Sequence, residues 1–334
     1  MWLPTREIRS DRIVLEANLD HWNRARGPHV ERVVYRNDIT PTKALDLVCD
    51  GEGEVDVLSE VSPADAQRVI DSEHAQLAVV DAMRMVSGII NRDVNDAPLD
   101  DVRARRALNL AVDRDALVAD VFGGYAYPLA GMTPPYASGL PDGIAPYPHD
   151  PEQARRLLAE AGWPDGRALR LAATSDVAAV AAAVAAQFGD ALGIDVEPIM
   201  IAGEDVLSAS HMLVEKVMPL PFDVMIHAWF DLASDAPPAV VHREYYHSGG
   251  AFRAGPVIDE FEQLLVRFAT QIDADEQRQA AGAIDQFAYD QALSVFLIAP
   301  QALYAVNRHV DFVGHAATFE LAETSVSADH WSRR

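Results

Sequence analysis

The residues best placed to do chemistry lie between His227 and Gly250, in the segment HAWFDLASDAPPAVVHREYYHSGG. An apolar run over 223–229 predicts a strand, and Trp229, Asp231 and Asp235 lie at or just beyond its carboxyl end. Ligands of α/β sheets gather at the carboxyl ends of strands. A carboxylate at this place could hold an ammonium group through a charge-assisted hydrogen bond. The alternative is that both acids cap or solvate the loop.

Tyr246 and Arg84 are two further candidates for contact with a ligand. Tyr246 adds a second aromatic ring to the same segment. Arg84 is a basic residue inside the apolar stretch VVDAMRMVSGII (79–90), and a guanidinium can hold a carboxylate through two parallel hydrogen bonds. The alternative for Arg84 is a buried ion pair or a side chain that extends to solvent.

His242, Glu244 and His247 raise the question of a metal, because imidazole and carboxylate ligands suit zinc or nickel. Their H-x-E-x-x-H spacing matches no strong metal-binding signature, so we expect no metal site. The chain also has neither a GxxxxGK[ST] phosphate loop nor a GxSxG nucleophile elbow. We therefore expect no cofactor.

Composition and charge narrow the class of protein. The chain has 334 residues, 49% of them hydrophobic and 23% charged, as is ordinary for a globular protein. Its net charge of −24 argues against nucleic acid as a partner, since phosphate binding needs a basic face. No apolar run approaches the roughly 20 residues needed to cross a bilayer. The single cysteine, Cys49, excludes an intrachain disulfide and is expected to be buried.

The hydrophobic pattern alternates between strands and helices. Short apolar bursts predict strands at 12–16, 32–36, 76–80, 85–90, 168–173, 194–201, 223–229, 294–298 and 302–306. Helical periodicity with capping residues predicts helices at 41–49, 63–71, 100–122, 151–161, 176–192, 204–216, 256–272 and 274–291. The strand–helix–strand order over 168–201 is typical of an α/β fold.

Two stretches between Leu99 and Trp163 carry a sequence signature. LDDVRARRALNLAVDRDALVADVFGG contains the pattern DxxxxRxALxxAxDR, and PYPHDPEQARRLLAEAGWPDG contains YxxDPxxAxxLLxEAG. In the second, Asp150 is placed to cap a helix that Gly162 ends. The order of these patterns resembles the family 5 solute-binding proteins, the peptide and nickel receptors of ABC importers.

The resemblance runs from RIVLEANLDHW (12–22) to HVDFVGH (309–315) and covers about the last two-thirds of a typical member. It implies a two-lobed, periplasmic-binding-protein-like α/β fold whose first lobe lacks its N-terminal part. Residues 1–98 and 296–334 would form the rest of that lobe, and residues 99–295 the second. It implies a small amino-acid-, dipeptide- or peptide-like ligand in a cleft between the lobes. In peptide-binding members an acid near the Trp takes the ligand's ammonium group, a role that Asp231 or Asp235 would fill.

The same resemblance bears on location and partners. The N-terminus has no basic region followed by an apolar one, which predicts a cytoplasmic protein for the chain as written. If the chain is a trimmed form of a precursor, a periplasmic or extracellular location and an ABC permease as partner follow instead. Apolar cleft surface left uncovered by a short first lobe would favour a homodimer.

An enzyme is the alternative to a binding protein. Arg6, His21 and Glu31 show a faint resemblance to the Pictet–Spengler cyclases of bacterial β-carboline pathways, which join tryptophan and an aldehyde. That resemblance implies that Glu31 takes a proton, Arg6 holds a carboxylate and His21 orients the second substrate.

Overall fold

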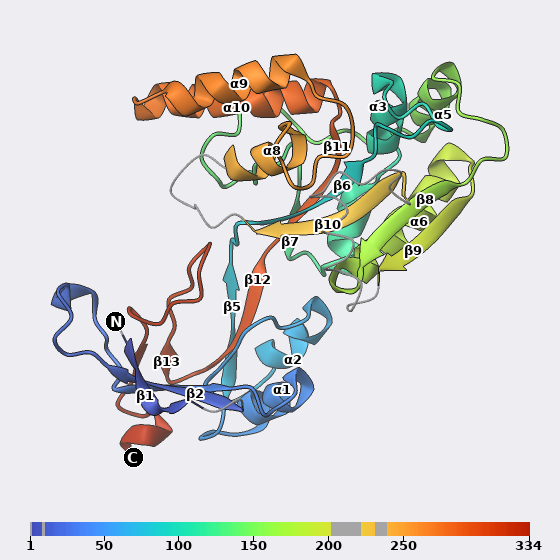
Figure 1. Cartoon of the computed structure of the whole chain (residues 1–334). Coiled ribbons are helices and arrows are strands. Elements are labelled where there is room, and N and C mark those ends of the chain that lie inside the picture. The colour runs from blue at the N-terminus through green and yellow to red at the C-terminus, as the bar shows by residue number, and fades with distance from the viewer. Residues whose placement is uncertain (1, 9–10, 202–221, 231–238) are drawn as a thin grey trace. The chain divides into compact units, whose positions relative to one another are not determined.

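A computed structural model describes the whole chain except residues 1, 9–10, 202–221 and 231–238. The chain forms two compact units, one built from residues 1–82 with 301–334 and the other from 83–300 (Figure 1). The expected boundaries at 98 and 295 fall inside the second unit. The reason is that strand β6 (Arg84–Ile90) pairs along its length with strand β10 (Val224–Phe230), and also with β11 (Ser294–Pro300).

The second unit is organised around a six-stranded mixed sheet with the order β7-β11-β6-β10-β8-β9. Strand β10 runs parallel to β8 (Leu169–Thr174), and β8 runs parallel to β9 (Val196–Ile201), whereas β6 and β11 are antiparallel to each other. Strand β7 (Ala126–Pro128) pairs with the far side of β11. The other elements of this unit are helices α3 (Val102–Leu110), α4 (Arg114–Ala116), α5 (Pro151–Glu160), α6 (Ala178–Leu192), α8 (Ala239–Tyr246), α9 (Asp259–Thr270) and α10 (Ala274–Asp290).

The first unit contains three small antiparallel sheets. One joins β1 (Trp2–Ile8), β2 (Arg12–Ala17) and β3 (Arg32–Arg36), and another joins β4 (Val57–Leu58), β12 (Ala302–Asn307) and β5 (Ala75–Val80). Strands β13 (Val310–Asp311) and β14 (Ser325–Val326) form the third. The described part of the unit also contains helices α1 (Pro41–Asp50) and α2 (Ala66–Ile70), and Cys49 is buried in α1 as expected.

Helix ends follow the capping residues that the sequence indicates. Thr40 accepts a hydrogen bond from Lys43 N at the start of α1, and Asp150 accepts one from Gln153 N at the start of α5. Gly162 and Gly193 follow the last turns of α5 and α6 with φ of +81° and +70°, the left-handed region that glycine enters without strain. These predicted boundaries are confirmed to within a few residues.

The single helix predicted over 100–122 is wrong. Helix α3 ends at Leu110, and Asp113 then adopts an extended conformation and accepts a hydrogen bond from Ala116 N. A one-turn helix α4 and a π-helical turn at Leu117–Val121 follow. The apolar spacing continues across this break, so periodicity alone does not reveal it. Strands β1 and β7 and helix α8 are further elements that the pattern did not predict, and the predicted helix 204–216 lies outside the described residues.

One helical stretch in the described part of the chain, Ser175–Leu192, is long and apolar enough to cross a membrane. It comprises a 3-10 turn and α6, and α6 connects the parallel strands β8 and β9. Six α6 side chains, Val180, Ala181, Val184, Phe188, Ala191 and Leu192, are buried in the core. Its apolar character is therefore that of a helix packed on a sheet.

The signature arginines, with Asn109 between them, tie α3 and α4 to β11 and to the residues just before it. Arg105 Nε donates to Gln291 O at 3.0 Å, and Asn109 Nδ2 donates to Ser294 O at 2.9 Å. The buried guanidinium of Arg114 donates to four backbone carbonyls and to Asn109 Oδ1. The signature therefore specifies the packing of the second unit and not its ligand.

Candidate functional site

Four side chains of the second unit form an aromatic patch: His227, Trp229, Tyr245 and Phe252. The ring of Phe252 lies 4.7 Å from that of His227 and 5.4 Å from that of Trp229, and Trp229 meets Tyr245 edge-on at 6.1 Å, all between centroids. His227 and Trp229 are two residues apart on β10, so both point to the same face of the sheet. Trp229 pairs with Met85, two residues from the point where the chain enters this unit.

Gly250 brings Phe252 to the patch. After α8 the chain folds back on the helix, and Phe252 N donates to Glu244 O at 2.9 Å. A Cβ on Gly250 would lie only 2.3 Å from Arg243 O, so a side chain at this position would block the turn. A glycine is therefore required for the close approach of the two backbones.

His227 carries no charge at neutral pH. Burial lowers the pKa of His227 to about 4, and its Nδ1 lies 2.9 Å from the hydroxyl of Tyr245. Burial also raises the pKa of Tyr245 well above its usual range. The patch is thus a neutral surface of rings, suited to contact with apolar groups and uncharged polar groups.

Trp229 supplies a buried polar group of the patch that lacks a partner in the described part of the chain. Its Nε1 is buried and makes no hydrogen bond there. A buried donor without an acceptor costs about 1–3 kcal/mol, and a ligand oxygen would remove that cost. Trp229 was among the ligand-binding residues expected from the sequence.

The ring of Tyr246 lies 6.1 Å from that of Tyr245, and both tyrosines are buried, so Tyr246 lies behind the patch. Tyr246 is 3% exposed, and its hydroxyl lies 2.8 Å from Ser294 Oγ inside the core. Burial raises the pKa of Tyr246. Arg84 pairs with Phe230, one residue beyond Trp229, so the pleat directs Arg84 and Trp229 to opposite faces of the sheet. Their contact with a ligand stays a prediction that these positions do not strengthen.

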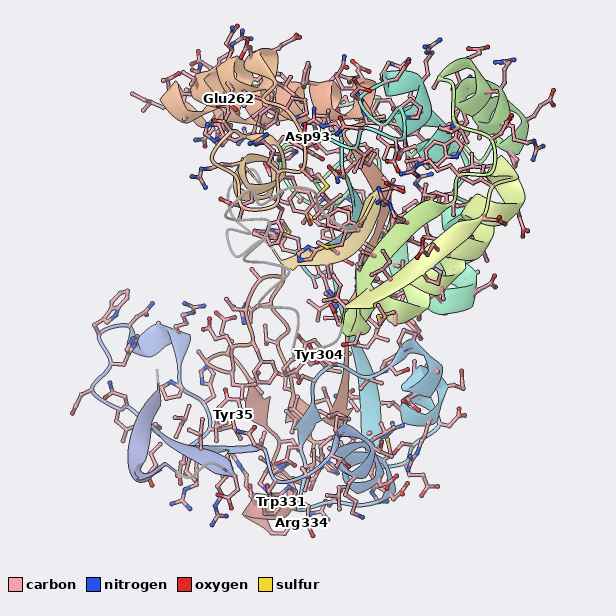
Figure 2. The ribbon with its side chains drawn as sticks, turned by 45° about the vertical axis from the view of Figure 1, so that its right-hand side comes forward. Tyr35, Asp93, Glu262, Tyr304, Trp331 and Arg334 are labelled. Atoms are coloured by element: carbon pink, nitrogen blue, oxygen red, sulfur yellow. The ribbon has the colours of Figure 1, made fainter. Side chains whose placement is uncertain are left out.

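Asp231 and Asp235 lie outside the described residues, so their predicted roles stay predictions. Two of the side chains considered for a metal are engaged elsewhere. His242 Nε2 lies 2.8 Å from Asp285 Oδ1, and His247 Nε2 lies 2.8 Å from Oε2 of Glu262, which is labelled in Figure 2. Among the described residues, no group of three or more His, Cys, Asp or Glu side chains is arranged to hold a metal ion.

The residues of the enzyme hypothesis all lie in the first unit. Glu31 is exposed, and its carbonyl accepts a hydrogen bond from Ala17 N. Arg6 lies on β1 between Pro4 and Ile8, which pair with Leu15 and Ile13. Glu31 is therefore displaced from Arg6 by about 10 Å along the strand direction, and strand β2 also lies between the two residues. The Nδ1 of His21 is engaged with the backbone of Asn23. No common constellation of the three residues emerges, and the enzyme hypothesis rests on the sequence alone.

Sequence reasoning named Trp229 but missed His227, Tyr245 and Phe252. The alternation His227–Ala228–Trp229 at the end of the predicted strand was the available signal for His227, because it puts both rings on one face. Tyr245 sits on α8, a helix that was not predicted, and Phe252 depends on the turn at Gly250. Neither contact could be read from local spacing.

The chain thus forms two units, and the second is an α/β unit that carries a neutral aromatic patch. Residues 6–251 match the family described as bacterial extracellular solute-binding proteins, family 5, middle part, and the chain belongs to this family. Since that description is of extracellular proteins, the expectation of a cytoplasmic location is not supported.

Curated relatives and solved structures agree with this assignment. The glutathione-binding protein GsiB of Salmonella typhi is 38% identical over 100 residues, which are 30% of this chain and 19% of that protein. The dipeptide-binding protein of Escherichia coli K12 is 31% identical over 144 residues, 43% of this chain and 26% of that protein. The match thus spans about a fifth to a quarter of these relatives.

The fold is shared with structures that have little sequence in common with this chain. The ABC transporter substrate-binding protein CtaP of Listeria monocytogenes superposes with a TM-score of 0.81 at 16% identity, over 98% of this chain and 66% of that one. A peptide-binding protein, AppA, from Clostridium difficile gives a TM-score of 0.83 at 14% identity, over 98% and 67%. This chain spans about two-thirds of either structure.

Proposed function

We propose that this protein binds a small peptide-like solute without covalent chemistry, as a receptor for an ABC importer. The observation that carries the proposal is the buried indole N–H of Trp229, which lacks an acceptor in the described structure and lies among neutral rings. A peptide offers carbonyl oxygens to such a donor and apolar side chains to the rings around it.

Relatives support the class of ligand. Similar proteins include a glutathione-binding protein, a dipeptide-binding protein and a periplasmic binding protein in complex with the peptide STSA. The neutral patch fits the backbone of a peptide better than a charged ligand, because neither His227 nor Tyr245 is ionised at pH 7. Asp231 or Asp235 would hold the ligand's ammonium group.

The family description also supports an exported location, and the partner would be an ABC permease. A receptor that serves a permease passes its ligand to the transporter without changing the ligand chemically. The ligand must therefore be held by reversible contacts, such as the hydrogen bond and ring contacts offered by the patch.

Calorimetric titration with alanyl-alanine, triglycine and glutathione tests the proposal. We expect at least one of them to bind, and Trp229→Phe to weaken that binding about tenfold, since one buried hydrogen bond is lost. Trp331→Phe is the matched control, because the Nε1 of Trp331 already donates to Asp56 at 2.8 Å in the first unit. Equal loss in both variants, or no binding of any peptide, would contradict the proposal.

A further inference from the structure

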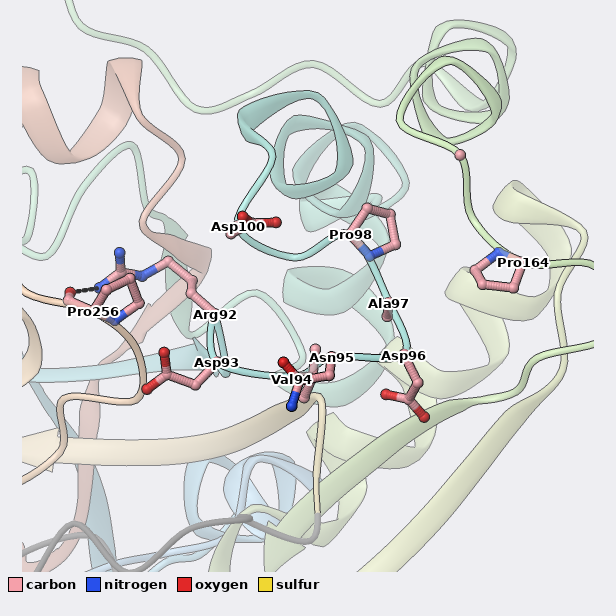
Figure 3. Close-up of a pocket in the computed structure, with 11 residues that line it drawn as sticks. Arg92, Asp93, Val94, Asn95, Asp96, Ala97, Pro98, Asp100, Pro164 and Pro256 are labelled. Atoms are coloured by element: carbon pink, nitrogen blue, oxygen red, sulfur yellow. Dashed lines mark hydrogen bonds between the residues drawn. The ribbon is translucent and has the colours of Figure 1, made fainter.

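A hollow of the second unit lies far from the aromatic patch. It has a volume of about 680 Å³ and is formed by the loop that follows β6, with Gly162, Pro164 and Pro256 on its other sides (Figure 3). Its size is within the range of about 300–1,000 Å³ that small-molecule sites occupy. Arg92 in this loop is seven residues beyond Met85, the partner of Trp229, which places the hollow roughly 20 Å from the patch along the strand.

Arg92 is the charged residue buried in this hollow. It is 9% exposed, and its one side-chain hydrogen bond runs from Nη2 to Pro256 O at 3.1 Å. No carboxylate lies within ion-pair distance of its guanidinium in the described parts of the chain. Asp93 and Asp100 act on Arg92 only at longer range, so a ligand carboxylate in direct contact would lower the cost of burying this cation.

The guanidinium of Arg92 is held in one position. Arg92 N donates to Ala254 O at 3.0 Å, and the side chain lies against Gly255, whose φ is +146°. A Cβ on Gly255 would come within 3.0 Å of both Cζ and Nε of Arg92. A glycine therefore lets the backbone lie flat against the guanidinium and fix its plane, which favours two-point binding of a carboxylate.

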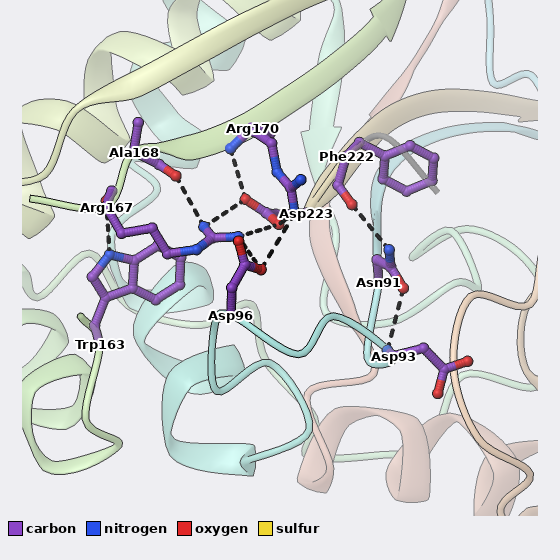
Figure 4. Close-up of polar contacts among 9 residues, drawn as sticks. All are labelled: Asn91, Asp93, Asp96, Trp163, Arg167, Ala168, Arg170, Phe222 and Asp223. Carbon is purple, nitrogen blue, oxygen red and sulfur yellow. Dashed lines mark hydrogen bonds and ion pairs between the residues drawn. The ribbon is translucent and has the colours of Figure 1, made fainter. Parts of the chain in front are cut away.

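Three aspartates lie around the same hollow, and they are not equivalent. The charge of Asp96 is already balanced, because its carboxylate forms ion pairs with Arg167 at 2.8 Å and Arg170 at 3.6 Å (Figure 4). Asp93 and Asp100 are exposed, and their carboxylates make no hydrogen bond or ion pair with any residue that the structure describes. The hollow thus offers one buried cation and two free anions at its rim.

We propose that this hollow is a second ligand site, which takes a small α-amino acid zwitterion or the zwitterionic ends of a short peptide. Arg92 holds the carboxylate, and Asp93 or Asp100 holds the ammonium group. A ligand with a carboxylate alone is disfavoured by the two rim acids, and one with an ammonium alone leaves Arg92 unpaired. The proposal does not depend on peptide binding at the aromatic patch.

The test is calorimetric titration of the Trp229→Phe variant with L-alanine, N-acetyl-L-alanine and L-alaninamide. Alanine carries both charges, and each of the other two lacks one of them. We expect alanine to bind at least tenfold more tightly than either analogue. Alanyl-alanine, titrated in parallel, separates a free amino acid from a peptide as the preferred source of the zwitterion.

Two variants assign the binding to the hollow. Asn95→Trp fills it from an exposed position of the lining loop and should abolish alanine binding without changing the melting temperature. Arg92→Lys keeps the charge but loses the planar fork and should weaken binding at least tenfold. Arg278→Gln, an exposed arginine on α10, is the control and should bind as the parent does.

Absence of alanine binding in Trp229→Phe, or unchanged binding in Asn95→Trp, would overturn the proposal. Because every measurement is made in the Trp229→Phe background, failure here is distinct from failure of peptide binding at the patch. Loss of peptide binding with retained alanine binding would refute the receptor role and leave the second site in place.

Discussion

Replacing Arg114 by methionine should destabilise the second unit strongly. The guanidinium donates to the carbonyls of Phe296, Asn109, Val112 and Tyr147 at 2.7–3.2 Å, and to Asn109 Oδ1 at 3.1 Å. A buried acceptor without a donor costs about 1–3 kcal/mol. Methionine fills a similar volume but donates to none of these oxygens. Most of the cost of leaving these acceptors without a donor should therefore appear as a lower free energy of unfolding.

The cost of burying the cation offsets part of this loss. Burial lowers the pKa of Arg114 from 12.5 to about 10, and this shift corresponds to about 3 kcal/mol of unfavourable desolvation that the methionine variant does not carry. If each of the five lost hydrogen bonds contributes about 1.4 kcal/mol, the net loss after this offset is about 4 kcal/mol in the free energy of unfolding.

Urea unfolding followed by tryptophan fluorescence measures this difference. With an m-value of about 2.5 kcal/mol/M, the midpoint of the transition should fall by roughly 1.5 M. Arg106→Met is the control, because Arg106 on the neighbouring helix α3 is exposed and its Nη2 donates to Asp290 O. A loss below 1 kcal/mol for Arg114→Met, or equal losses in both variants, would refute the structural role of the signature arginine.

Three other perturbations have definite outcomes. Gly131→Ala should lower the free energy of unfolding by about 2–3 kcal/mol in the same urea assay, because the new Cβ would lie 2.5 Å from Asp285 Oδ1. Gly51→Ala is the control: Gly51 has open space around it, so the free energy of unfolding should change by no more than about 0.5 kcal/mol. The pKa of His227 is about 4 in the folded protein and 6.5 in the unfolded chain, so the contribution of His227 to stability is full above pH 6.5 and falls by about 3 kcal/mol as the pH drops to 4. His227→Phe should remove this pH dependence of the free energy of unfolding. Parallel stability curves for the two proteins would contradict the prediction. Trp22, 87% exposed, should contribute to self-association, so light scattering should find a dimer that Trp22→Ser converts to monomers, and a monomeric parent would show the prediction wrong.

Elements whose limits are set locally could be predicted from the sequence. The caps at Thr40 and Asp150 and the glycines that end α5 and α6 act within one helical turn, so their effect is visible in the residue order. The family signature could be read for the same reason, since its two patterns are each contained in a short stretch of sequence around α3 and α5.

Features that depend on distant residues could not be predicted. The break at Asp113 is supported by Gln187 of α6, whose side chain accepts a hydrogen bond from Asp113 N and donates one to Asp113 O. Strand β6 was assigned to the first lobe by its place in the chain, but its pairing with β10 and β11 puts it in the second. Pairing between strands far apart in sequence leaves no local signal.

The candidate binding residues likewise divide into those set by local sequence and those set by distant residues. Trp229 could be named because it ends a predictable strand and matches a family motif. The hollow at Arg92 could not be predicted from the sequence. Its guanidinium is fixed by a contact with the backbone of Gly255, which is more than 160 residues away in the chain. An isolated arginine after a strand gives no indication of such a neighbour.

The most direct test of the central claim is the indole N–H region of a nitrogen-15 NMR spectrum during peptide titration. The chain has five tryptophans, and Trp229→Phe assigns the signal of interest. We predict that a bound peptide moves the Trp229 Nε1–H signal downfield as its carbonyl accepts the hydrogen bond. The signals of Trp163 and Trp331, whose N–H groups already donate to Arg167 O and Asp56, should stay in place. A Trp229 signal that does not move at saturating peptide would contradict the account.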